Sequence, residues 1–211
     1  MWPKWFYPMF AVKLFWTGSK ITKKCISTFQ LNMPKEINVL RDVSQKLLGA
    51  GIQYMLTGSL ALSYYAEPRM TRDIDIVIQV GKKDTDRLIE LFEGDYYLPR
   101  NAATRAIASE TLFNVIHTRE IVKVDLIIRK SSDYRRLEFE RRQEVKVEGV
   151  PIWIVSKEDL IISKLLWAKD SHSQLQLKDV KNLLKSGYDD AYLKEWTERL
   201  GLNDLLKEAS A

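Results

Sequence analysis

Pairs of aspartates separated by one residue are the first candidates for chemistry in this chain of 211 residues. The chain contains 14 aspartates, so roughly one such pair is expected by chance and the bare pattern has little specificity. Two pairs occur, Asp73 with Asp75 and Asp84 with Asp86. Asp84 and Asp86 open a predicted helix, where acids in the first turn interact with the helix dipole. We therefore interpret the second pair as structural.

The first pair opens a predicted strand over 73–80, on which Asp73 and Asp75 share one face about 7 Å apart. Two carboxylates at the edge of an apolar layer are costly unless cations neutralise them, and oxygen ligands suit Mg²⁺. Asp125 interrupts a second apolar strand over 121–128. If the strands are neighbours, three carboxylates converge as in two-metal phosphoryl transfer. In the alternative interpretation, Asp73 caps a turn and Asp125 pairs with a lysine.

Gly58 and Ser59 lie between a predicted strand and a predicted helix. Free backbone N–H groups and the helix dipole favour an anion at such a position, although an ordinary turn has the same sequence. Arg69 and Arg72 flank the start of the strand that carries the aspartate pair. Arg69 is the better candidate for a phosphate clamp, and Arg72 is interpreted as a solvated surface charge.

The periodicity of the apolar residues predicts the elements that must position these groups. Strands are expected at 52–56, 73–80, 112–117, 121–128, 145–147 and 152–155, with helices at 35–49, 60–66, 84–93 and 132–143. Helices at 157–169, 175–186 and 190–208 complete the chain. We expect an α+β fold, a mixed β-sheet flanked by helices and followed by a small C-terminal helical segment. The expected organisation is an N-terminal extension over 1–32, a core over 33–155 and a helical segment over 156–211.

Composition narrows the class of protein. Hydrophobic residues make up 45% and charged residues 29%, which excludes a disordered or membrane-embedded chain. The net charge of +5 resides entirely in residues 1–32. Residues 33–211 therefore have no net positive charge that would favour binding to nucleic acid. The single cysteine allows no intrachain disulfide and no zinc cluster. We expect a cytoplasmic protein without stable membrane insertion.

Residues 1–32 are unusually aromatic and basic. We interpret them as an extension outside the core, or as the product of a mis-assigned start. A secretory signal fits poorly because Pro3 and Pro8 interrupt the segment, and an interfacial membrane anchor is the other alternative.

The segment YMLTGSLALSYYAEPRMTRDIDIVI, together with Asp125, resembles the DNA polymerase β-like nucleotidyltransferase superfamily. The resemblance covers roughly residues 36–130. It implies a nucleotidyltransferase-like core in which Asp73, Asp75 and Asp125 are catalytic and hold two Mg²⁺ ions. Asp73 and Asp75 would bind metal and nucleotide phosphates, and Asp125 would bind the second metal and help to deprotonate the attacking hydroxyl. Gly58, Ser59 and Arg69 would contact the nucleotide.

The form PRMTRDID is most similar to small bacterial members of this superfamily, including abortive-infection toxins of toxin–antitoxin pairs. These tend to have a downstream lysine and acid, for which Lys164 and Asp179 are the nucleotide-binding candidates. Lys164 lies in an apolar run, so it either reaches the triphosphate or extends its ammonium to solvent. Asp179 either orients a base or pairs with a neighbouring lysine.

These features predict a Mg²⁺-dependent nucleotidyltransferase that moves NMP from an NTP to a hydroxyl acceptor. The resemblance favours RNA, such as tRNA, or protein as the acceptor, with an antitoxin as a further partner. The alternative enzyme is a nucleotidyltransferase that modifies an antibiotic or another small molecule. The non-enzymatic alternative is a regulator that binds a nucleotide without turnover. About 86 residues follow Asp125, too few for a large nucleic-acid-gripping domain, which argues against DNA polymerisation.

Overall fold

The computed structural model describes residues 34–211, so the predictions for residues 1–32 lie outside the described chain. Seven strands in this part of the chain form one sheet. They are β1 (Tyr54–Thr57), β2 (Asp73–Ile78), β3 (Tyr96–Tyr97), β4 (Leu112–His117), β5 (Val122–Ile128), β6 (Gln143–Val147) and β7 (Val150–Ile154).

Helices precede, separate and follow these strands. They are α2 (Pro34–Gly49), α3 (Gly58–Tyr65), α4 (Thr85–Phe92), α5 (Arg100–Ser109), α6 (Asp133–Glu140), α7 (Lys157–Ser171), α8 (Gln174–Leu184), α9 (Asp190–Arg199) and α10 (Asn203–Ser210). A short 3₁₀ turn, Lys82–Asp84, leads into α4. Among residues 34–211, no helix combines the length and the apolar character needed to cross a bilayer.

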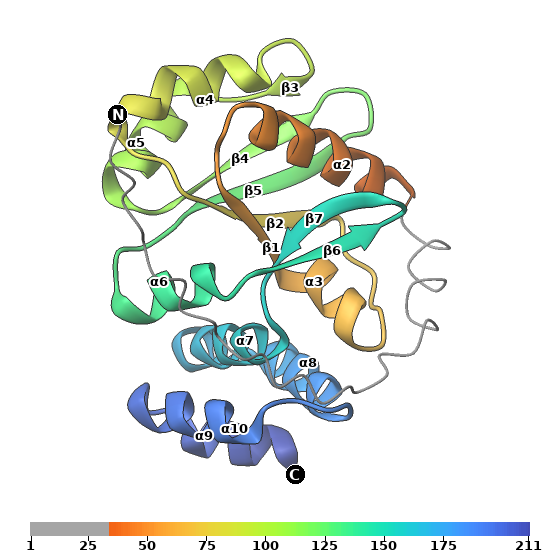
Figure 1. Ribbon diagram of the computed structural model, residues 1–211, viewed down its shortest axis with the longest axis vertical. Helices are drawn as coiled ribbons and strands as arrows, with labels where there is room; N and C mark the ends of the chain where they lie inside the picture. Colours follow the sequence, from red (N-terminus) through yellow and green to blue (C-terminus); the bar gives the residue numbers. More distant parts are fainter. Residues whose placement is uncertain (1–33) are drawn as a thin grey trace, which may run out of the picture.

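The sheet is mixed, with the strand order β3-β4-β5-β2-β1-β7-β6. β2 runs parallel to β5 and β1 runs parallel to β7, whereas the other neighbours are antiparallel. In Figure 1, α2, α4 and α5 lie above the sheet, and α3 and the helices from α6 to α10 lie below it. The expected α+β fold, a mixed sheet followed by helices, is confirmed.

Alternation along the two central strands separates an apolar face from a polar one. On β2, Ile74, Ile76 and Ile78 are completely buried, whereas the residues between them, beginning with Asp73, are partly exposed. β5 repeats this alternation from Val122 onward. Because side chains point to opposite faces at every second position, the in-register pairing of β2 with β5 gathers the polar residues on one face.

Two features of the chain depart from the sequence-based expectations. No element was predicted between residues 94 and 111, where β3 and α5 lie, because α5 buries only Ala103, Ala106 and Ile107. The single helix expected over 190–208 is wrong. Gly201 has a φ of 64°, the left-handed region that ends helices, and the Leu202 N–H donates back to the Thr197 carbonyl at 2.7 Å.

A buried carboxylate ties the helices below the sheet together. The Asp159 side chain lies in the first turn of α7 and is completely buried. Such a charge is tolerated only where donors surround it. Four side-chain groups on α6, on α9 and at the ends adjoining α6 and α7 donate to it: Ser156 Oγ at 2.6 Å, Tyr192 OH at 2.7 Å, Arg141 Nε at 3.0 Å and Tyr134 OH at 3.2 Å.

Asp159→Ala should therefore destabilise the protein, since it leaves buried donors without an acceptor. We expect a loss of at least about 2 kcal/mol in the free energy of unfolding, measured by urea denaturation. Asp204→Ala is the control, because Asp204 also lies in the first turn of a helix but its side chain is fully exposed. A cost for Asp159→Ala no larger than that of the control would contradict this account.

Candidate active site

The register of β2 and β5 sets the positions of the acidic residues. Asp75 lies directly beside Asp125, and Asp73 lies directly beside Lys123. All four residues occupy the polar face of the two strands. We call Asp73, Asp75 and Asp125 the carboxylate row. The structure thus brings together the three acids that the sequence singled out.

Lys123 lies within this row, and sequence reasoning missed it. Its Nζ is 3.2 Å from a carboxylate oxygen of Asp73 and 3.3 Å from one of Asp125. One part of the alternative interpretation, that Asp125 pairs with a lysine, is therefore observed together with the convergence of the acids. The Asp73 carboxylate also contacts this lysine, whereas the alternative expected it to cap a turn. The signal was present in the sequence, because Lys123 precedes Asp125 by two residues and must share its strand face.

Asn114 is a second residue that the sequence analysis overlooked. It lies opposite Asp125 in the antiparallel β4–β5 pair, and its side-chain amide donates a hydrogen bond to Asp125 Oδ1. One oxygen of Asp125 is thus bound by Asn114 and the other faces Lys123. The only hint was a polar residue in the middle of an otherwise apolar strand.

Gly58 closes the site from the side of α3. Its φ is 65°, and a Cβ at this position would overlap the Asp75 carboxylate. Glycine is therefore required at this position for two reasons: the backbone conformation and the close approach of Asp75. The backbone N–H of Ser59 donates to Asp75. The start of α3 and the centre of β2 are in direct contact.

Burial, together with two neighbouring carboxylates, raises the pKa of Asp75. Burial raises its pKa, the carboxylates of Asp125 and Asp73 raise it further, and the resulting value is about 6. The ammonium of Lys164 and the Ser59 N–H act in the opposite direction and only partly offset this rise. The ionised form of Asp75 is therefore disfavoured by burial first and by the two neighbouring carboxylates second.

Arg69, Lys164 and Asp179 form a second cluster beside the start of α3. Arg69 Nε donates to Asp179 Oδ1 at 3.0 Å, and its Nη2 donates to Ser59 Oγ at 2.6 Å and to Asp179 Oδ2 at 3.0 Å. Lys164 Nζ donates to Asp179 Oδ2 at 2.7 Å and to Gln176 at 3.1 Å. The four nucleotide-binding candidates Ser59, Arg69, Lys164 and Asp179 are thus joined in one network.

The environment of Lys164 excludes one of its two interpretations. Its side chain is buried, so the extension of the ammonium to solvent is wrong. Burial lowers the pKa of Lys164, whereas Asp179 and Asp75 raise it. Asp179 pairs with a lysine, but with Lys164 from the preceding helix instead of a sequence neighbour.

The other polar candidates lie apart from this site or at its margin. Arg72 is exposed, as its interpretation as a solvated surface charge requires. Asp84 accepts from the Gly81 N–H at the entrance to α4, and Asp86 is exposed near Arg100. The structural interpretation of the second aspartate pair is therefore confirmed.

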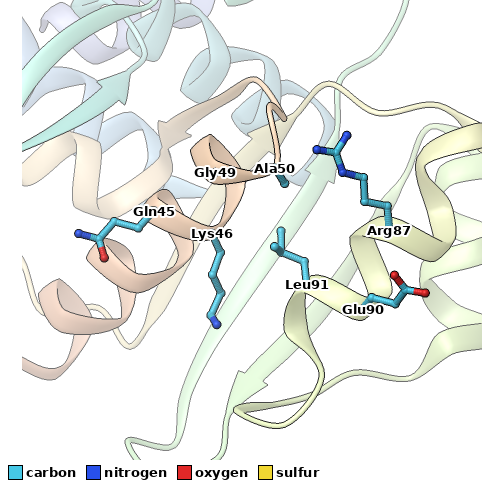
Figure 2. Close-up of a pocket in the computed structure, with 7 residues that line it drawn as sticks. All are labelled: Gln45, Lys46, Gly49, Ala50, Arg87, Glu90 and Leu91. Carbon is cyan, nitrogen blue, oxygen red and sulfur yellow. The ribbon is translucent and has the colours of Figure 1, made fainter.

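An open hollow of about 520 Å³ lies elsewhere, between α2 and α4 (Figure 2). Its lining includes Lys46, Arg87 and Glu90, and Lys46 is paired with Asp42 and Asp95. No residue of the carboxylate row or of the Arg69 network contributes to it. We therefore do not assign it to the candidate site.

The donor chemistry of the carboxylate row fits Mg²⁺, which prefers carboxylate oxygens. Part of the rise in the pKa of Asp75, after burial, comes from the carboxylates of Asp125 and Asp73, and a cation would offset that part. Within residues 34–211, however, no three His, Cys, Asp or Glu side chains are arranged to hold one ion together. In the arrangement described, Lys123 is the cation that bridges Asp73 and Asp125.

Gly58→Ala should destabilise the protein by more than the strain of placing alanine in a left-handed backbone conformation. Gly51 provides the matched control, because its φ is 64° and no atom would contact an added Cβ. We expect Gly58→Ala to lower the free energy of unfolding by at least about 1 kcal/mol more than Gly51→Ala, since only the former displaces a partly buried carboxylate. Equal costs in thermal and urea unfolding would show that the contact with Asp75 is unimportant.

Asp75→Asn should change the pH dependence of stability. Between pH 3.8 and about 6, the folded chain retains a proton on Asp75 that the unfolded chain has released, so stability falls as pH rises through this window. In EDTA we expect the variant to gain about 1–3 kcal/mol over the wild type at pH 8 and almost nothing at pH 4. Urea unfolding at both pH values, with Asp204→Asn as the control, measures this difference. An equal effect at both values would contradict it.

Comparisons with known proteins agree with this architecture. No protein-family model and no curated protein sequence matches the chain. Among solved structures, the antibiotic-resistance factor ANT(2″)-Ia in solution aligns with a TM-score of 0.52 and 11% identity, over 80% of this chain and 95% of that one. The crystal structure of ANT(2″)-Ia in complex with adenylyl-2″-tobramycin gives 0.51 and 12%, over 83% and 99%.

An antigenic nucleotidyltransferase-like protein from Paracoccidioides brasiliensis aligns with a TM-score of 0.49 and 19% identity, over 81% of this chain and 91% of that one. The two ANT(2″)-Ia alignments, with TM-scores above 0.5, show the fold alone. The chain therefore has the fold of ANT(2″)-Ia, a nucleotidyltransferase-like mixed sheet with helices.

Proposed function

We propose that this protein is a Mg²⁺-dependent nucleotidyltransferase that transfers NMP from an NTP to a hydroxyl acceptor. One observation supports the proposal most directly. The parallel pairing of β2 and β5 gathers Asp73, Asp75 and Asp125 on one face, and Asp75 touches the start of α3 at Gly58. A row of carboxylates, whose oxygens suit Mg²⁺, beside a helix N-terminus, which favours phosphate, supports triphosphate transfer.

Asp73, Asp75 and Asp125 would hold the Mg²⁺ ions. When bound there, Mg²⁺ neutralises phosphate oxygens and makes the acceptor hydroxyl more acidic. Asp125 is the residue that would accept the proton of this hydroxyl, and Asn114 keeps its carboxylate in place. The acceptor oxygen then forms a bond to the α-phosphorus as the bond to the bridging oxygen breaks, and pyrophosphate leaves.

The start of α3 would bind the triphosphate. Its first backbone N–H groups and the helix dipole favour an anion, and glycine at position 58 permits close approach. Arg69 is held beside Ser59 by its bonds to Asp179, which engage Nε and Nη2 and leave Nη1 for a phosphate oxygen. Lys164 and Asp179 are buried, so their role in the proposal is to hold Arg69 and to balance charge.

The acceptor separates two candidate enzymes. The form PRMTRDID favours RNA or protein, as expected of a toxin that an antitoxin partner would restrain. A small-molecule acceptor is the second candidate, because the ANT(2″)-Ia alignments cover 95% and 99% of that protein. The non-catalytic alternative is a regulator that binds a nucleotide without transferring it. Such a protein would not need three carboxylates on one face, so the row favours an enzyme.

Asp73→Ala should abolish transfer. We would incubate the protein with each α-³²P-labelled NTP and Mg²⁺, and supply total cellular RNA, cellular protein or tobramycin as the acceptor. We expect label on one acceptor class, and a loss of at least about 100-fold in its rate for Asp73→Ala, since one metal ligand is removed. Asp86→Ala is the matched control, because Asp86 belongs to the other aspartate pair and is exposed.

The acceptor that becomes labelled identifies the enzyme class. Binding of NTP without transfer to any acceptor would support the regulator. Equal transfer by the Asp73→Ala and Asp86→Ala variants would contradict the role of the carboxylate row.

A further inference from the structure

We propose that Lys123 competes with the divalent cation for Asp73 and Asp125 and thereby sets the metal affinity of the site. The inference rests on the proposed function, because it assigns metal binding to the same carboxylates. It concerns a residue of this chain that neither the motif nor the fold assigns to the site. Lys123 would act as an internal counter-ion of the carboxylate row.

The placement of Lys123 is fixed by the sheet. It is the register partner of Asp73 across β2 and β5, and it precedes Asp125 by two residues on the same strand. Its ammonium contacts both carboxylates at nearly equal distances, 3.2 Å and 3.3 Å. A bridging cation between two metal-ligating carboxylates occupies oxygens that a metal ion would need.

The ion pairs of Lys123 are exchangeable. Its side chain is 38% exposed and that of Asp73 is 48% exposed, whereas that of Asp125 is 16% exposed. An ion pair so close to solvent contributes little net stability, because water screens it and long side chains lose entropy. The ammonium can therefore leave the row at little cost when a doubly charged ion arrives.

Asp75 favours the divalent cation over the Lys123 ammonium in this competition. In the described part of the chain it has no ion pair within the usual distance, and Lys123 neutralises only the other two acids. A divalent cation beside Asp75 gains attraction from a carboxylate that Lys123 does not reach. The site should therefore favour Mg²⁺ over the lysine, but with an affinity that the lysine reduces.

Lys123 lies between two of the three acids. The backbone register brings three acids together, yet no group of three metal-ligating side chains is formed within residues 34–211. Without Lys123 between Asp73 and Asp125, the row would lose the positive charge of this ammonium. It would then attract a metal ion more strongly. A lysine that only stabilises the sheet would leave metal affinity unchanged.

The test measures Mn²⁺ binding by electron paramagnetic resonance on the metal-free protein, without nucleotide. Lys123→Met should bind Mn²⁺ at least about tenfold more tightly than the wild type, because a unit charge beside the ion is removed. Lys123→Arg keeps the charge and should stay within about twofold of the wild type. Lys83→Met is the matched control, since Lys83 is an exposed lysine beyond the other end of β2.

The gain for Lys123→Met should shrink as salt is raised, because salt screens charge. Thermal unfolding in EDTA verifies that each variant is folded. Unchanged or weaker Mn²⁺ binding by Lys123→Met, or an equal gain in Lys83→Met, would overturn the inference. Tighter binding by Lys123→Met without nucleotide transfer by the wild type would support it while contradicting the proposed function, so the two failures are distinguishable.

Discussion

The parallel pairing of β2 with β5 is the constraint on which the site depends. Its register sets Asp75 beside Asp125 on a partly buried face, where like charges repel. The neighbouring groups partly offset this repulsion: Lys123 bridges two of the acids, the Ser59 N–H donates to Asp75, and Asn114 donates to Asp125. The apolar residues on the opposite face of the same strands stabilise a register that the charges alone would disfavour.

The helices below the sheet take part in the same arrangement. Asp179 on α8 binds Lys164 on α7 and Arg69 before β2, and Arg69 in turn binds Ser59 at the start of α3. Buried charges of this kind are tolerated only when each has its partners. The C-terminal helical segment therefore positions the residues beside the Gly58 turn, as well as covering the core.

Much of this arrangement could be predicted from local patterns. Alternation along the chain predicted β2 and β5, and it placed Asp73, Asp75 and Asp125 on strands. The pattern could not give strand order or register, so the roles of Lys123 and Asn114 became visible only with their cross-strand partners. The network of Arg69 joins residues about 110 positions apart, for which no local signal exists.

The most direct test is the position of a bound ion in a crystal of the wild-type protein grown with Mn²⁺ and a non-hydrolysable NTP analogue. The account predicts an anomalous Mn²⁺ peak within ligand distance of Asp75 and Asp125, with the triphosphate at the start of α3 and the Lys123 ammonium displaced from Asp73. A peak remote from these acids, or a nucleotide bound elsewhere with Lys123 still bridging the row, would contradict it.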